Sequence, residues 1–579
     1  MSQHRDGSDD PQAGKRPSPM EPLAASNAAS NAAPKAAPAD DRYPRFSTAD
    51  IEKMMRFGMI EHWRAGDVMF RTGQPGLGMR VLLNGRARLS RRDGLGRSQT
   101  IVELGAGQFL GEVAQLTGKP ALADGLALED VEALMIAPQQ IRDMLVAEAQ
   151  LGERIMRSLL LRRFGLVREG AGPVLIGRSG DLKLLALEGL LHRLGHPYSV
   201  ADPATDADIR ALLEEWGVWR DGEPVVMLAD GTLLQDPDER QLAARLGLLP
   251  ELDSARIYDV AVVGAGPAGL AAAVYAASEG LSVIVFDSHG PGGQAGASAR
   301  IENYLGFSTG VSGRELAANA FAQAVKFGAE VVIPTRIDRL DCAQAPLQLE
   351  LQGGQRIASR TVVIATGAAY RRPAIEGLDE VAGRGVYYWA SSIEGRLCRG
   401  AEVVLVGGGN SAGQAAVFLS THASRVHILI RGDSLETSMS RYLIDRLASL
   451  GNVVLHARTV VASVRSDAWG LEAVMCNTPE GELVFDTRHL FLFTGASPNT
   501  QWLRDCSVEI DDRGFVKTGL AAGVRADTAC FALQTNVPGV FAIGDVRNAS
   551  AKRVAAAVGD GAAVVAEIHQ FLSAPLPAA

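Results

Sequence analysis

Residues 258–287 read YDVAVVGAGPAGLAAAVYAASEGLSVIVFD. An apolar strand runs into a glycine-rich turn, an alanine-rich helix follows, and a second apolar strand ends at Asp287. The first glycine of such a turn allows the tight bend, the second lets the backbone approach a pyrophosphate, and the third lets the helix pack against the strand. An acid about 20 residues further on accepts a hydrogen bond from an adenosine ribose. The sequence predicts a dinucleotide site at Gly264, Gly266, Pro267, Ala268, Gly269 and Asp287.

The same pattern returns at residues 403–420, VVLVGGGNSAGQAAVFLS. A buried strand again leads through glycines into a helix, which predicts a second dinucleotide site at Gly407, Gly409, Asn410, Ser411 and Ala412. Two such folds in one chain need two dinucleotides. The simplest pair is FAD, which stores a hydride, and NAD(P)H, which supplies it.

Further motifs resemble the low-molecular-weight thioredoxin reductase family across roughly residues 257–572. They are GGQ at 292–294, IENYLGF at 301–307, VIATG at 363–367, TG at 494–495, PNT at 498–500 and VPGVFAIGD at 537–545. The resemblance implies an FAD domain made of residues 256–385 and 498–579, an NAD(P)H domain at 386–497, and a homodimer. It implies that Gln294 and Asn303 reach the isoalloxazine and that Asp545 binds the ribityl chain. The FAD contacts it adds are Gly293, Gln294, Asn303, Thr366, Gly367, Gly544, Asp545, Arg553 and Val554.

The chain departs from this family where the family carries its redox-active C-x-x-C. The matching text is VYYWASSIEG at 386–395, so Trp389 and Ser392 stand at the two cysteine positions. A serine hydroxyl does not form a disulfide, so the family's dithiol relay cannot run here. Cys398 lies nearby without a resolving cysteine and is expected to be structural. No catalytic residue is therefore predicted in this chain.

The family also binds the 2′-phosphate of NADPH with an H-R-R sequence and a further arginine. Here only Arg431 remains, between Ile430 and Gly432, and Glu436 adds a negative charge. One cation favours a phosphate modestly and the carboxylate opposes it. Arg441 could replace the missing cation or could be a solvated charge. Both NADPH and NADH stay open.

The N-terminal part carries two different segments. Residues 1–42 are poor in large apolar side chains and are predicted to be disordered. Residues 43–170 combine a short helix at 48–57, glycine-separated strands and a long helix at 138–166. With the sequence FLGEVA at 109–114, they resemble a cyclic-nucleotide-binding domain, in which Gly111 and Glu112 would contact the nucleotide.

Ala121 stands where that family has its phosphate-binding arginine, and Asp124 adds a negative charge nearby. Without the arginine a buried phosphate loses charge-assisted hydrogen bonds. The domain either binds a nucleotide effector weakly or keeps only the fold.

Residues 171–250 alternate strands and helices in an order that resembles a glutaredoxin/thioredoxin-like domain, with Pro224 at that fold's cis-proline position. The redox pair of that fold would lie near residues 179–182, where there is no cysteine. We expect a redox-silent adaptor.

Composition limits the remaining function classes. The chain has 579 residues, 47% of them hydrophobic, and a net charge of −9. This length predicts several domains, and the charge argues against nucleic acid as a partner. No apolar run is long enough to span a membrane, and no signal peptide is expected. The fold class predicted is a β-roll or jelly roll, an α/β thioredoxin-like domain and two Rossmann-like α/β domains.

Five cysteines lie at 342, 398, 476, 506 and 530, without C-x-x-C or metal-ligand spacing. They predict separate, mostly buried thiols, no metal site and a cytoplasmic location.

Three functions stay open. The first is an oxidoreductase that passes electrons from NAD(P)H through FAD to an unidentified acceptor. The second is a sensor that reports flavin or nucleotide occupancy without rapid turnover. The third is a working thioredoxin reductase, which would need a redox-active cysteine pair elsewhere in the chain. The sequence suggests no such pair.

Overall fold

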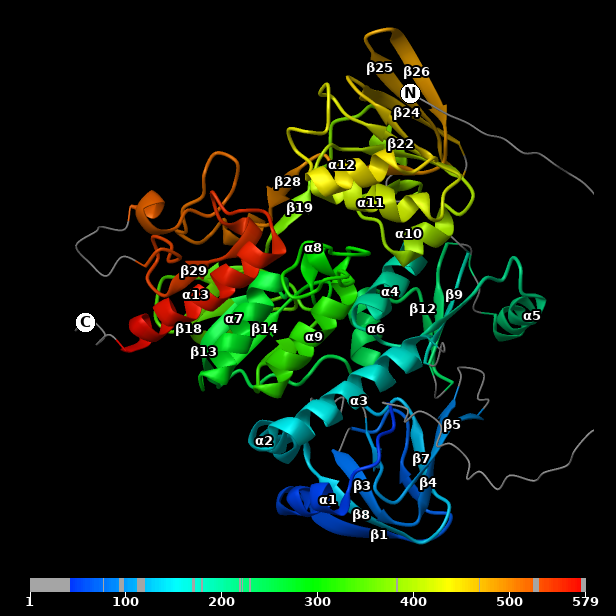
Figure 1. The fold of residues 1–579 in the computed structure, drawn as a ribbon, viewed down its shortest axis with the longest axis vertical. Helices are drawn as coiled ribbons and strands as arrows, with labels where there is room; N and C mark the ends of the chain where they lie inside the picture. Colours follow the sequence, from blue (N-terminus) through cyan, green and yellow to red (C-terminus); the bar gives the residue numbers. More distant parts are fainter. Residues whose placement is uncertain are drawn as a thin grey trace, which may run out of the picture. The chain divides into compact units, whose positions relative to one another are not determined.

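The structure is a computed structural model, and it describes residues 42–573 except 76–77, 93–97, 112–119, 169–171, 179–180, 218–219, 221, 229–230, 382–383, 468 and 524–530. The predicted tail, 1–42, lies outside these residues apart from Arg42. No helix in the described part of the chain is long and apolar enough to cross a membrane. Figure 1 labels the elements along the chain.

The first part of the chain is rich in β-structure. Its strands form two four-stranded sheets, ordered β1-β8-β3-β6 and β2-β7-β4-β5. The elements are α1 (Thr48–Met54), η1 (Met55–Phe57), β1 (Met59–Trp63), β2 (Val68–Phe70), β3 (Met79–Asn84), β4 (Arg86–Arg92), β5 (Ser98–Gly105), β6 (Phe109–Leu110), β7 (Asp124–Ala127), β8 (Val131–Ile136), α2 (Pro138–Ala147) and α3 (Ala149–Arg168).

The single long helix predicted at 138–166 is wrong, because the chain leaves helical geometry at Glu148 (φ −118°, ψ 75°) between α2 and α3. Gly152 explains how the two helices meet so closely: a Cβ there would lie 2.7 Å from the carbonyl oxygen of Leu145. The Glu148 carboxylate pairs with Lys53 at 3.5 Å and with Arg56. The break therefore turns α3 away from α2 at a residue that is held by the first helical segment.

The second part is a small α/β unit of four strands and three helices. In the sheet order β10-β9-β11-β12, β10 and β9 are parallel and β11 is antiparallel to both of its neighbours. Among the described residues, cis peptide bonds precede Pro334 and Pro346 but not Pro224, so that detail of the prediction is wrong. The elements are β9 (Val174–Ile176), α4 (Leu182–Arg193), β10 (Ser199–Ala201), α5 (Ala207–Trp216), β11 (Val225–Met227), β12 (Leu233–Gln235) and α6 (Glu239–Arg245).

The third part holds the first glycine-rich turn and is discontinuous in sequence. Its sheet has the order β15-β14-β13-β18-β17-β16, and β29 joins β18 from the end of the chain. The elements are β13 (Ile257–Val263), α7 (Pro267–Ser278), β14 (Val283–Phe286), α8 (Gly293–Gly296), α9 (Gly313–Lys326), β15 (Glu330–Val332), β16 (Ile337–Asp341), β17 (Leu347–Leu351), β18 (Arg356–Ile364), η4 (Gln501–Leu503), η5 (Gly519–Ala522), β29 (Val540–Ala542), η6 (Gly544–Val546) and α13 (Val554–Ser573).

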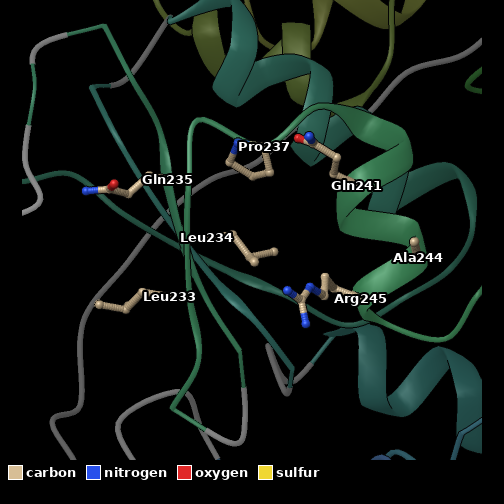
Figure 2. Close-up of a pocket in the computed structure, with 7 residues that line it drawn as sticks. All are labelled: Leu233, Leu234, Gln235, Pro237, Gln241, Ala244 and Arg245. Carbon is tan, nitrogen blue, oxygen red and sulfur yellow. The ribbon is translucent and has the colours of Figure 1, made fainter.

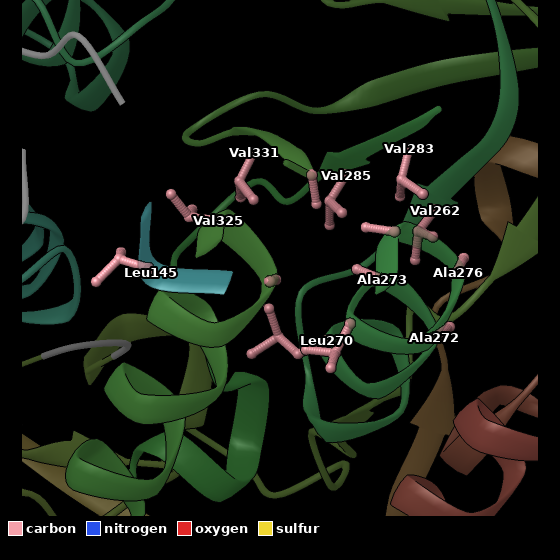
Figure 3. Close-up of a cluster of buried hydrophobic side chains, with 14 of the residues drawn as sticks. Leu145, Val262, Leu270, Ala272, Ala273, Ala276, Val283, Val285, Val325 and Val331 are labelled. Atoms are coloured by element: carbon pink, nitrogen blue, oxygen red, sulfur yellow. The ribbon is translucent and has the colours of Figure 1, made fainter. Parts of the chain in front are cut away.

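The strand alternation of β13 buries both of its faces. Val262 packs with Val283, Val285 and Leu270 under the helices, as Figure 3 shows. Ala261 and Val263 belong instead to a second cluster with Leu340 and Leu349 of the antiparallel strands. Burial on both faces explains why the strand is apolar at almost every position.

The fourth part is inserted between β18 and β29. Its parallel sheet, β20-β27-β21-β22-β23, is followed by an antiparallel sheet, β24-β25-β26, and the ribbon β19-β28 joins the insertion to the third part. The elements are β19 (Ala368–Tyr370), η3 (Leu378–Val381), β20 (Val386–Tyr387), α10 (Ser392–Leu397), β21 (Glu402–Val406), α11 (Asn410–Ser420), β22 (Arg425–Leu429), α12 (Arg441–Ala448), β23 (Val453–His456), β24 (Val460–Asp467), β25 (Gly470–Thr478), β26 (Gly481–Asp486), β27 (Leu490–Leu492) and β28 (Ala496–Pro498).

Candidate functional site: two glycine-rich turns and a missing dithiol

The turn after β13 has three glycines with three different surroundings. Gly264 has φ +114°, and a Cβ there would lie 2.2 Å from the carbonyl oxygen of Ala365 on the next strand. A Cβ on Gly269 would lie 1.9 Å from the oxygen of Gly264, so this glycine lets the helix touch the turn. Gly266 caps α7, and a Cβ there would meet no atom within 4 Å. The space beside Gly266, at a helix N-terminus that begins with Pro267 and Ala268, can therefore admit a pyrophosphate.

Asp287 follows β14 and holds the turn together. One carboxylate oxygen accepts the amide of Ala265 at 2.8 Å, and the other accepts the amides of His289 and Gly290 at 2.8 and 3.0 Å. The acid thus organises two loops at the carboxyl edge of the sheet, where a ribose would lie.

A second glycine loop adjoins the first. Gly292 has φ +98° and donates its amide to the oxygen of Ala265 at 2.7 Å. A Cβ on Gly293 would lie 3.2 Å from the Cα of Gly266. Gln294 donates a side-chain hydrogen bond to the carbonyl oxygen of Ala368, the first residue of β19. The GGQ motif therefore connects the first turn to the inserted part.

Asn303 is exposed on the loop between Ile301 and Val311, whose backbones pair at 2.7 and 3.0 Å. Arg553 is likewise exposed, just before Val554 begins α13.

The motifs from the two ends of the discontinuous sheet meet at its carboxyl edge. Thr366 donates its hydroxyl to the carbonyl oxygen of Asn499 at 2.8 Å, and the Asn499 side-chain amide donates to the oxygen of Thr366 at 2.9 Å. The backbone amide of Asn499 also donates to the carbonyl oxygen of Gly367 at 3.1 Å. This reciprocal pair fixes the point at which the chain returns from the insertion.

Gly544 and Asp545 follow β29 at the same edge. A Cβ on Gly544 would lie 2.8 Å from the Cβ of Ala268, so the last motif touches the start of α7. Burial raises the pKa of Asp545, and the neighbouring Asp560 adds to the rise while Lys552 opposes it. A half-buried carboxyl at this position is suited to accept a hydroxyl of a bound ligand.

The second glycine-rich turn repeats the geometry of the first. Gly407 has φ +147°, and a Cβ there would lie 2.8 Å from the oxygen of Phe493 and 3.2 Å from the Cβ of Ala412. Gly409 caps α11 with no atom within 4 Å of a Cβ, which again leaves space for a pyrophosphate. Ser411 is exposed on the first turn of α11.

Asn410 has a structural contact that its motif did not reveal. Its side-chain amide donates to the hydroxyl of Ser440 at 3.0 Å, and its side-chain oxygen accepts the Ser440 amide at 2.7 Å. Ser440 caps α12, so Asn410 ties the two helices of this part together.

The charges expected near a 2′-phosphate are arranged unevenly. Arg431 is exposed after β22. Arg441 forms exposed ion pairs with Asp445 at 2.8 Å and with Glu436 at 3.7 Å. Arg431 forms no ion pair with another described residue, so it is the more readily available of the two arginines.

The segment that should carry the dithiol carries a helix cap instead. Ser391 caps α10, and Glu394 accepts the amide of Ser391 at 2.8 Å and the indole N–H of Trp389 at 3.0 Å. Trp389 is half-exposed, and Ser392 is the first residue of α10. A tryptophan and a serine therefore stand where the redox chemistry of the family would take place.

Cys398 ends α10 as a buried thiol that donates to the oxygen of Gly395 at 3.8 Å. Burial raises its pKa to about 11, so it is a thiol rather than a thiolate at neutral pH. The expected structural role fits these surroundings.

The expectation of five separate thiols is wrong. Cys342, which follows β16, and Cys506, which follows η4, form a disulfide with a Cα–Cα distance of 6.0 Å. The pair could not be predicted from local spacing, because the two cysteines are 164 positions apart in the sequence. Cys476 is a buried free thiol, and Cys530 lies outside the described residues.

This disulfide lies far from the glycine-rich turn. Strand register places Asp341 level with Gln348, Ala358 and Ile257, near the amino end of β13. The turn begins beyond Val263, about 20 Å further along the strand at 3.3 Å per residue. The pair therefore cannot replace a dithiol next to a flavin.

In the first part, Gly111 (φ +147°) ends the short strand β6. The buried guanidinium of Arg162 donates to the oxygens of Phe109 and Gly111 at 2.9 and 2.8 Å, which ties α3 to this position. Glu112 lies outside the described residues.

Ala121 is buried and exchanges backbone hydrogen bonds with Gly73 and Gln74, both at 2.9 Å. Asp124 accepts the amide of Thr72 at 2.7 Å. No cation replaces the family's arginine at position 121 itself.

A pocket of about 410 Å³ lies elsewhere, between β12 and α6 (Figure 2). Leu233, Leu234, Pro237 and Ala244 give it an apolar lining, with Arg245 at one side. None of the predicted dinucleotide residues lines this pocket. No group of histidine, cysteine and acidic side chains suited to a metal ion occurs in the part of the chain that the structure describes.

Two family models match the sequence. The model described as "Pyridine nucleotide-disulphide oxidoreductase" matches residues 258–561, which is more than half of the chain, and the model described as "Cyclic nucleotide-binding domain" matches residues 60–148. The matched ranges include both glycine-rich turns and both β-rich sheets.

Similar proteins cover the C-terminal half. A thioredoxin reductase of Mycoplasmopsis pulmonis is 32% identical over 308 residues, 53% of this chain and 94% of that protein. A thioredoxin reductase of Bacillus subtilis is 31% identical over 320 residues, 55% of this chain and 95% of that protein. The crystal structure of T. acidophilum thioredoxin reductase is 29% identical, with a TM-score of 0.50, over 55% of this chain and 100% of that one.

The backbone is open beside Gly266 and Gly409, at the two turns where a pyrophosphate would approach, and the matched family uses FAD and NAD(P)H. The chain belongs to the pyridine nucleotide-disulphide oxidoreductases and is a thioredoxin-reductase-like, FAD- and NAD(P)H-dependent oxidoreductase with an N-terminal cyclic-nucleotide-binding domain.

Proposed function

We propose that the protein moves a hydride from NAD(P)H to FAD and passes the electrons to an acceptor other than the disulfide of thioredoxin. The observation that carries this proposal is the pair Trp389 and Ser392 at the positions of the family's redox cysteines. An indole and a hydroxyl cannot cycle between dithiol and disulfide. The Cys342–Cys506 pair does not fill the gap, because it lies at the other end of the strands.

We further propose that FAD is held at the carboxyl edge of the β13 sheet. The small residues and the acid of the first turn receive the adenosine and pyrophosphate, and Asp545 accepts from the ribityl chain. The proposed FAD contacts are Gly264, Gly266, Pro267, Ala268, Gly269, Asp287, Gly293, Gln294, Asn303, Thr366, Gly367, Gly544, Asp545, Arg553 and Val554. The NAD(P)H contacts are Gly407, Gly409, Asn410, Ser411, Ala412 and Arg431. The proposed boundaries stay at 256–385 and 498–579 for the FAD domain and at 386–497 for the NAD(P)H domain.

The pairing of Arg441 with Glu436 and Asp445 supports Arg431, rather than Arg441, as the cation that contacts a 2′-phosphate. One exposed arginine gives a modest preference, so we propose NADPH as the better donor and NADH as a usable one.

The N-terminal domain (43–170) is proposed to act as a regulatory or docking module that binds a nucleotide weakly through Gly111 and Glu112. The unit at 171–250, proposed to be thioredoxin-like from its strand order, has no cysteine and serves as an adaptor. The homodimer stays a prediction of the resemblance. The cytoplasmic location also stays a prediction, since the disulfide removes the argument from five separate thiols.

Anaerobic titration of the FAD-loaded protein with NADPH and with NADH tests the hydride step. We expect both nucleotides to bleach the flavin absorbance near 450 nm rapidly. NADPH should do so at a lower concentration than NADH. A flavin that neither nucleotide bleaches would contradict the oxidoreductase and favour the sensor.

A further inference from the structure

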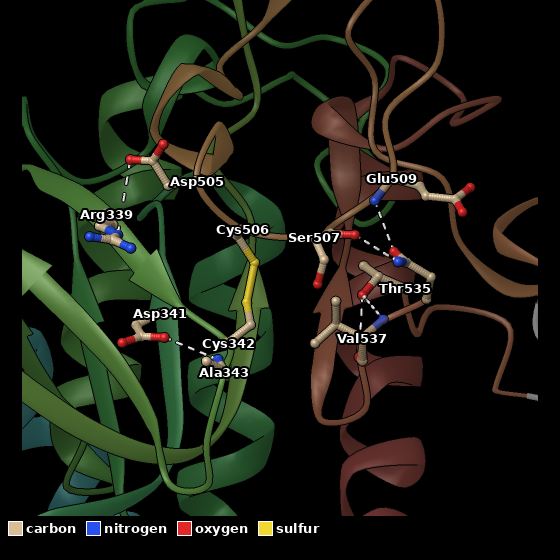
Figure 4. The surroundings of a disulfide bond; sticks show 11 residues. Arg339, Asp341, Cys342, Ala343, Asp505, Cys506, Ser507, Glu509, Thr535 and Val537 are labelled. Atoms are coloured by element: carbon tan, nitrogen blue, oxygen red, sulfur yellow. Dashed lines mark hydrogen bonds and ion pairs between the residues drawn. A yellow bond between two sulfur atoms is a disulfide. The ribbon is translucent and has the colours of Figure 1, made fainter.

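The Cys342–Cys506 disulfide joins the two chain segments that together make the FAD-binding sheet. Cys342 follows β16 in the first segment, and Cys506 lies in the second segment, shortly after the chain returns from the insertion. The whole inserted NAD(P)H-binding part lies inside the loop that the disulfide closes between two cysteines 164 positions apart. Figure 4 shows the bond between the strands of the first segment and the returning chain.

Residues 499–506 form a strap, as we name it, that is fixed at both ends. One end is the reciprocal hydrogen-bonded pair of Asn499 and Thr366, and the other end is the disulfide. Between them, Leu503 is buried in the same cluster as Leu340. The strap therefore runs from the carboxyl edge of the sheet towards the far end of β16.

Apart from the apolar packing of Leu503 and Val508, the contacts at the disulfide end of the strap are weak or lie further along the chain. Arg339 and Asp505 form an ion pair at 4.0 Å with side chains 48% and 71% exposed, and exposed pairs of this kind contribute little. The next ties are at Ser507 and Glu509, which bond to the side chain of Asn536 at 2.7 and 2.8 Å. The disulfide thus adds a covalent link between the strap and β16 to the apolar packing of Leu503.

The strap leads on to the proposed ribityl contact. Lys517 donates its amide to the oxygen of Glu509 at 3.0 Å, and Val516 donates to the oxygen of Val546 at 3.0 Å, next to Asp545. Two backbone hydrogen bonds therefore connect the chain that follows Cys506 to the segment next to Asp545.

Cys342 and Cys506 are only partly buried, at the edge of the core cluster. This surrounding differs from that of Cys398 and Cys476, which are fully buried. A partly exposed disulfide is open to attack by a thiolate.

We propose that Cys342–Cys506 is a reversible thiol–disulfide exchange site that takes a dithiol as its reductant, and that it controls how firmly the protein retains FAD. A thiolate of the dithiol attacks one sulfur, the S–S bond breaks and a mixed disulfide forms. The second thiol then displaces the remaining protein thiolate. The pair gains two electrons and two protons and becomes two thiols, while the dithiol becomes a disulfide. The opened strap keeps its hydrogen bonds, the exposed ion pair and the buried side chain of Leu503, but it loses its covalent link to β16, and FAD leaves more readily.

The experiment uses the FAD-loaded full chain, oxidised in air and then incubated anaerobically with dithiothreitol. Denaturing alkylation and mass spectrometry count the thiols: with one disulfide among five cysteines, we expect three before reduction and five after it. FAD release is followed by the rise of free-flavin fluorescence after dilution. Loss of the closed loop should speed this release by about tenfold.

The double variant Cys342→Ser, Cys506→Ser is the matched open form, and Cys398→Ser is the control that keeps the bond. The double variant should release FAD as fast as the reduced wild type, with or without dithiothreitol, which also reveals any effect of the reagent on the flavin. If the double variant does not fold, the oxidised and reduced wild type still give the comparison. A disulfide that is absent from oxidised protein, that resists the dithiol in the native state, or whose opening leaves FAD release unchanged would overturn the proposal.

Discussion

Gly293 abuts Gly266, although one begins α8 and the other precedes α7: a Cβ on Gly293 would lie 3.2 Å from the Cα of Gly266. The two turns that border the proposed FAD pyrophosphate therefore form a single wall made of backbone. A wall without side chains leaves room for a ligand and makes both positions sensitive to any added atom.

Replacing Gly266 by valine should give a folded protein without FAD. The φ of Gly266 is −72° and a Cβ there meets no atom of the protein, so the fold tolerates the side chain while the pyrophosphate does not. The ratio of absorbance at 450 and 280 nm measures the FAD content, and circular dichroism checks the fold.

Variants at two further glycines serve as controls for this experiment. Gly559→Ala on α13 adds a Cβ that also meets no atom within 4 Å, and this variant should keep its FAD. Gly269→Ala forces a contact with the oxygen of Gly264 and should lose stability. A Gly266→Val protein with full flavin would refute the proposed pyrophosphate site.

Replacing Gly409 by valine should leave FAD bound and abolish bleaching by NAD(P)H. The Cβ again enters open space, here at the cap of α11, so the loss falls on the second dinucleotide alone. Stopped-flow absorbance at 450 nm measures the bleaching, and chemical reduction with dithionite shows that the flavin itself still accepts electrons. Unchanged bleaching rates would contradict the assignment of this turn to NAD(P)H.

Thioredoxin reduction should be absent or very slow, because Trp389 and Ser392 replace the dithiol. The assay couples NADPH oxidation to the reduction of thioredoxins from several sources, with a C-x-x-C-containing thioredoxin reductase as the positive control. Turnover near one per second, within the ordinary enzyme range, would show that another relay operates.

Cyclic AMP and cyclic GMP should bind the full chain with dissociation constants above about 10 μM. Ala121 cannot make the charge-assisted hydrogen bonds of an arginine, and each such bond contributes about 1.5–3 kcal/mol to binding. Isothermal titration measures the affinity. Ala121→Arg is the matched variant, and it should strengthen binding by about tenfold if its side chain reaches the phosphate. Wild-type binding tighter than 10 μM would restore a nucleotide-regulated enzyme.

His489 should make the inserted NAD(P)H-binding part sensitive to acid. Burial and the charge of Arg488 lower the pKa of His489 to about 4, whereas an unfolded histidine titrates near 6.5. Between pH 6.5 and pH 4 this histidine is therefore protonated in the unfolded chain but neutral in the folded chain. Its contribution to the free energy of unfolding is complete above pH 6.5 and is lost as the pH falls towards 4.

Replacing His489 by glutamine removes that contribution. Between pH 7 and pH 4.5 the wild type should lose up to about 2–3 kcal/mol more than the variant. The variant also loses the 3.4 Å contact between the His489 ring and the Tyr387 hydroxyl. The melting temperatures of both proteins at the two pH values give the difference, in which the loss of this contact cancels. Equal losses in both proteins would show that His489 does not drive the acid response.

The local structure of the two turns was predictable, because it depends on contacts within about 30 residues. The strand, the bend at Gly264 and the close approach at Gly269 follow from apolar runs and glycine spacing. The second turn repeats the arrangement at Gly407 and Gly409.

Contacts over long distances in sequence were not predictable in the same way. No local pattern indicates that Cys342 meets Cys506, since the folding of two separate segments into one sheet brings them together. The end of α2 at Glu148 was not predicted, because the ion-pair partners of Glu148 lie in the first helical segment, far away in sequence. The side chain of Asn410 likewise takes its partner, Ser440, from the next helix.

The ribbon of β19 and β28 places the two ends of the insertion side by side, with Ala368 opposite Pro498 and Tyr370 opposite Ala496. An antiparallel pair of strands can be closed by a turn of two residues. The inserted part thus enters and leaves the third part at one hairpin, and a short turn from Tyr370 to Ala496 would leave every strand of the β13 sheet with its neighbours. We expect that a recombination at this single hairpin could remove or exchange the proposed domain of the hydride donor.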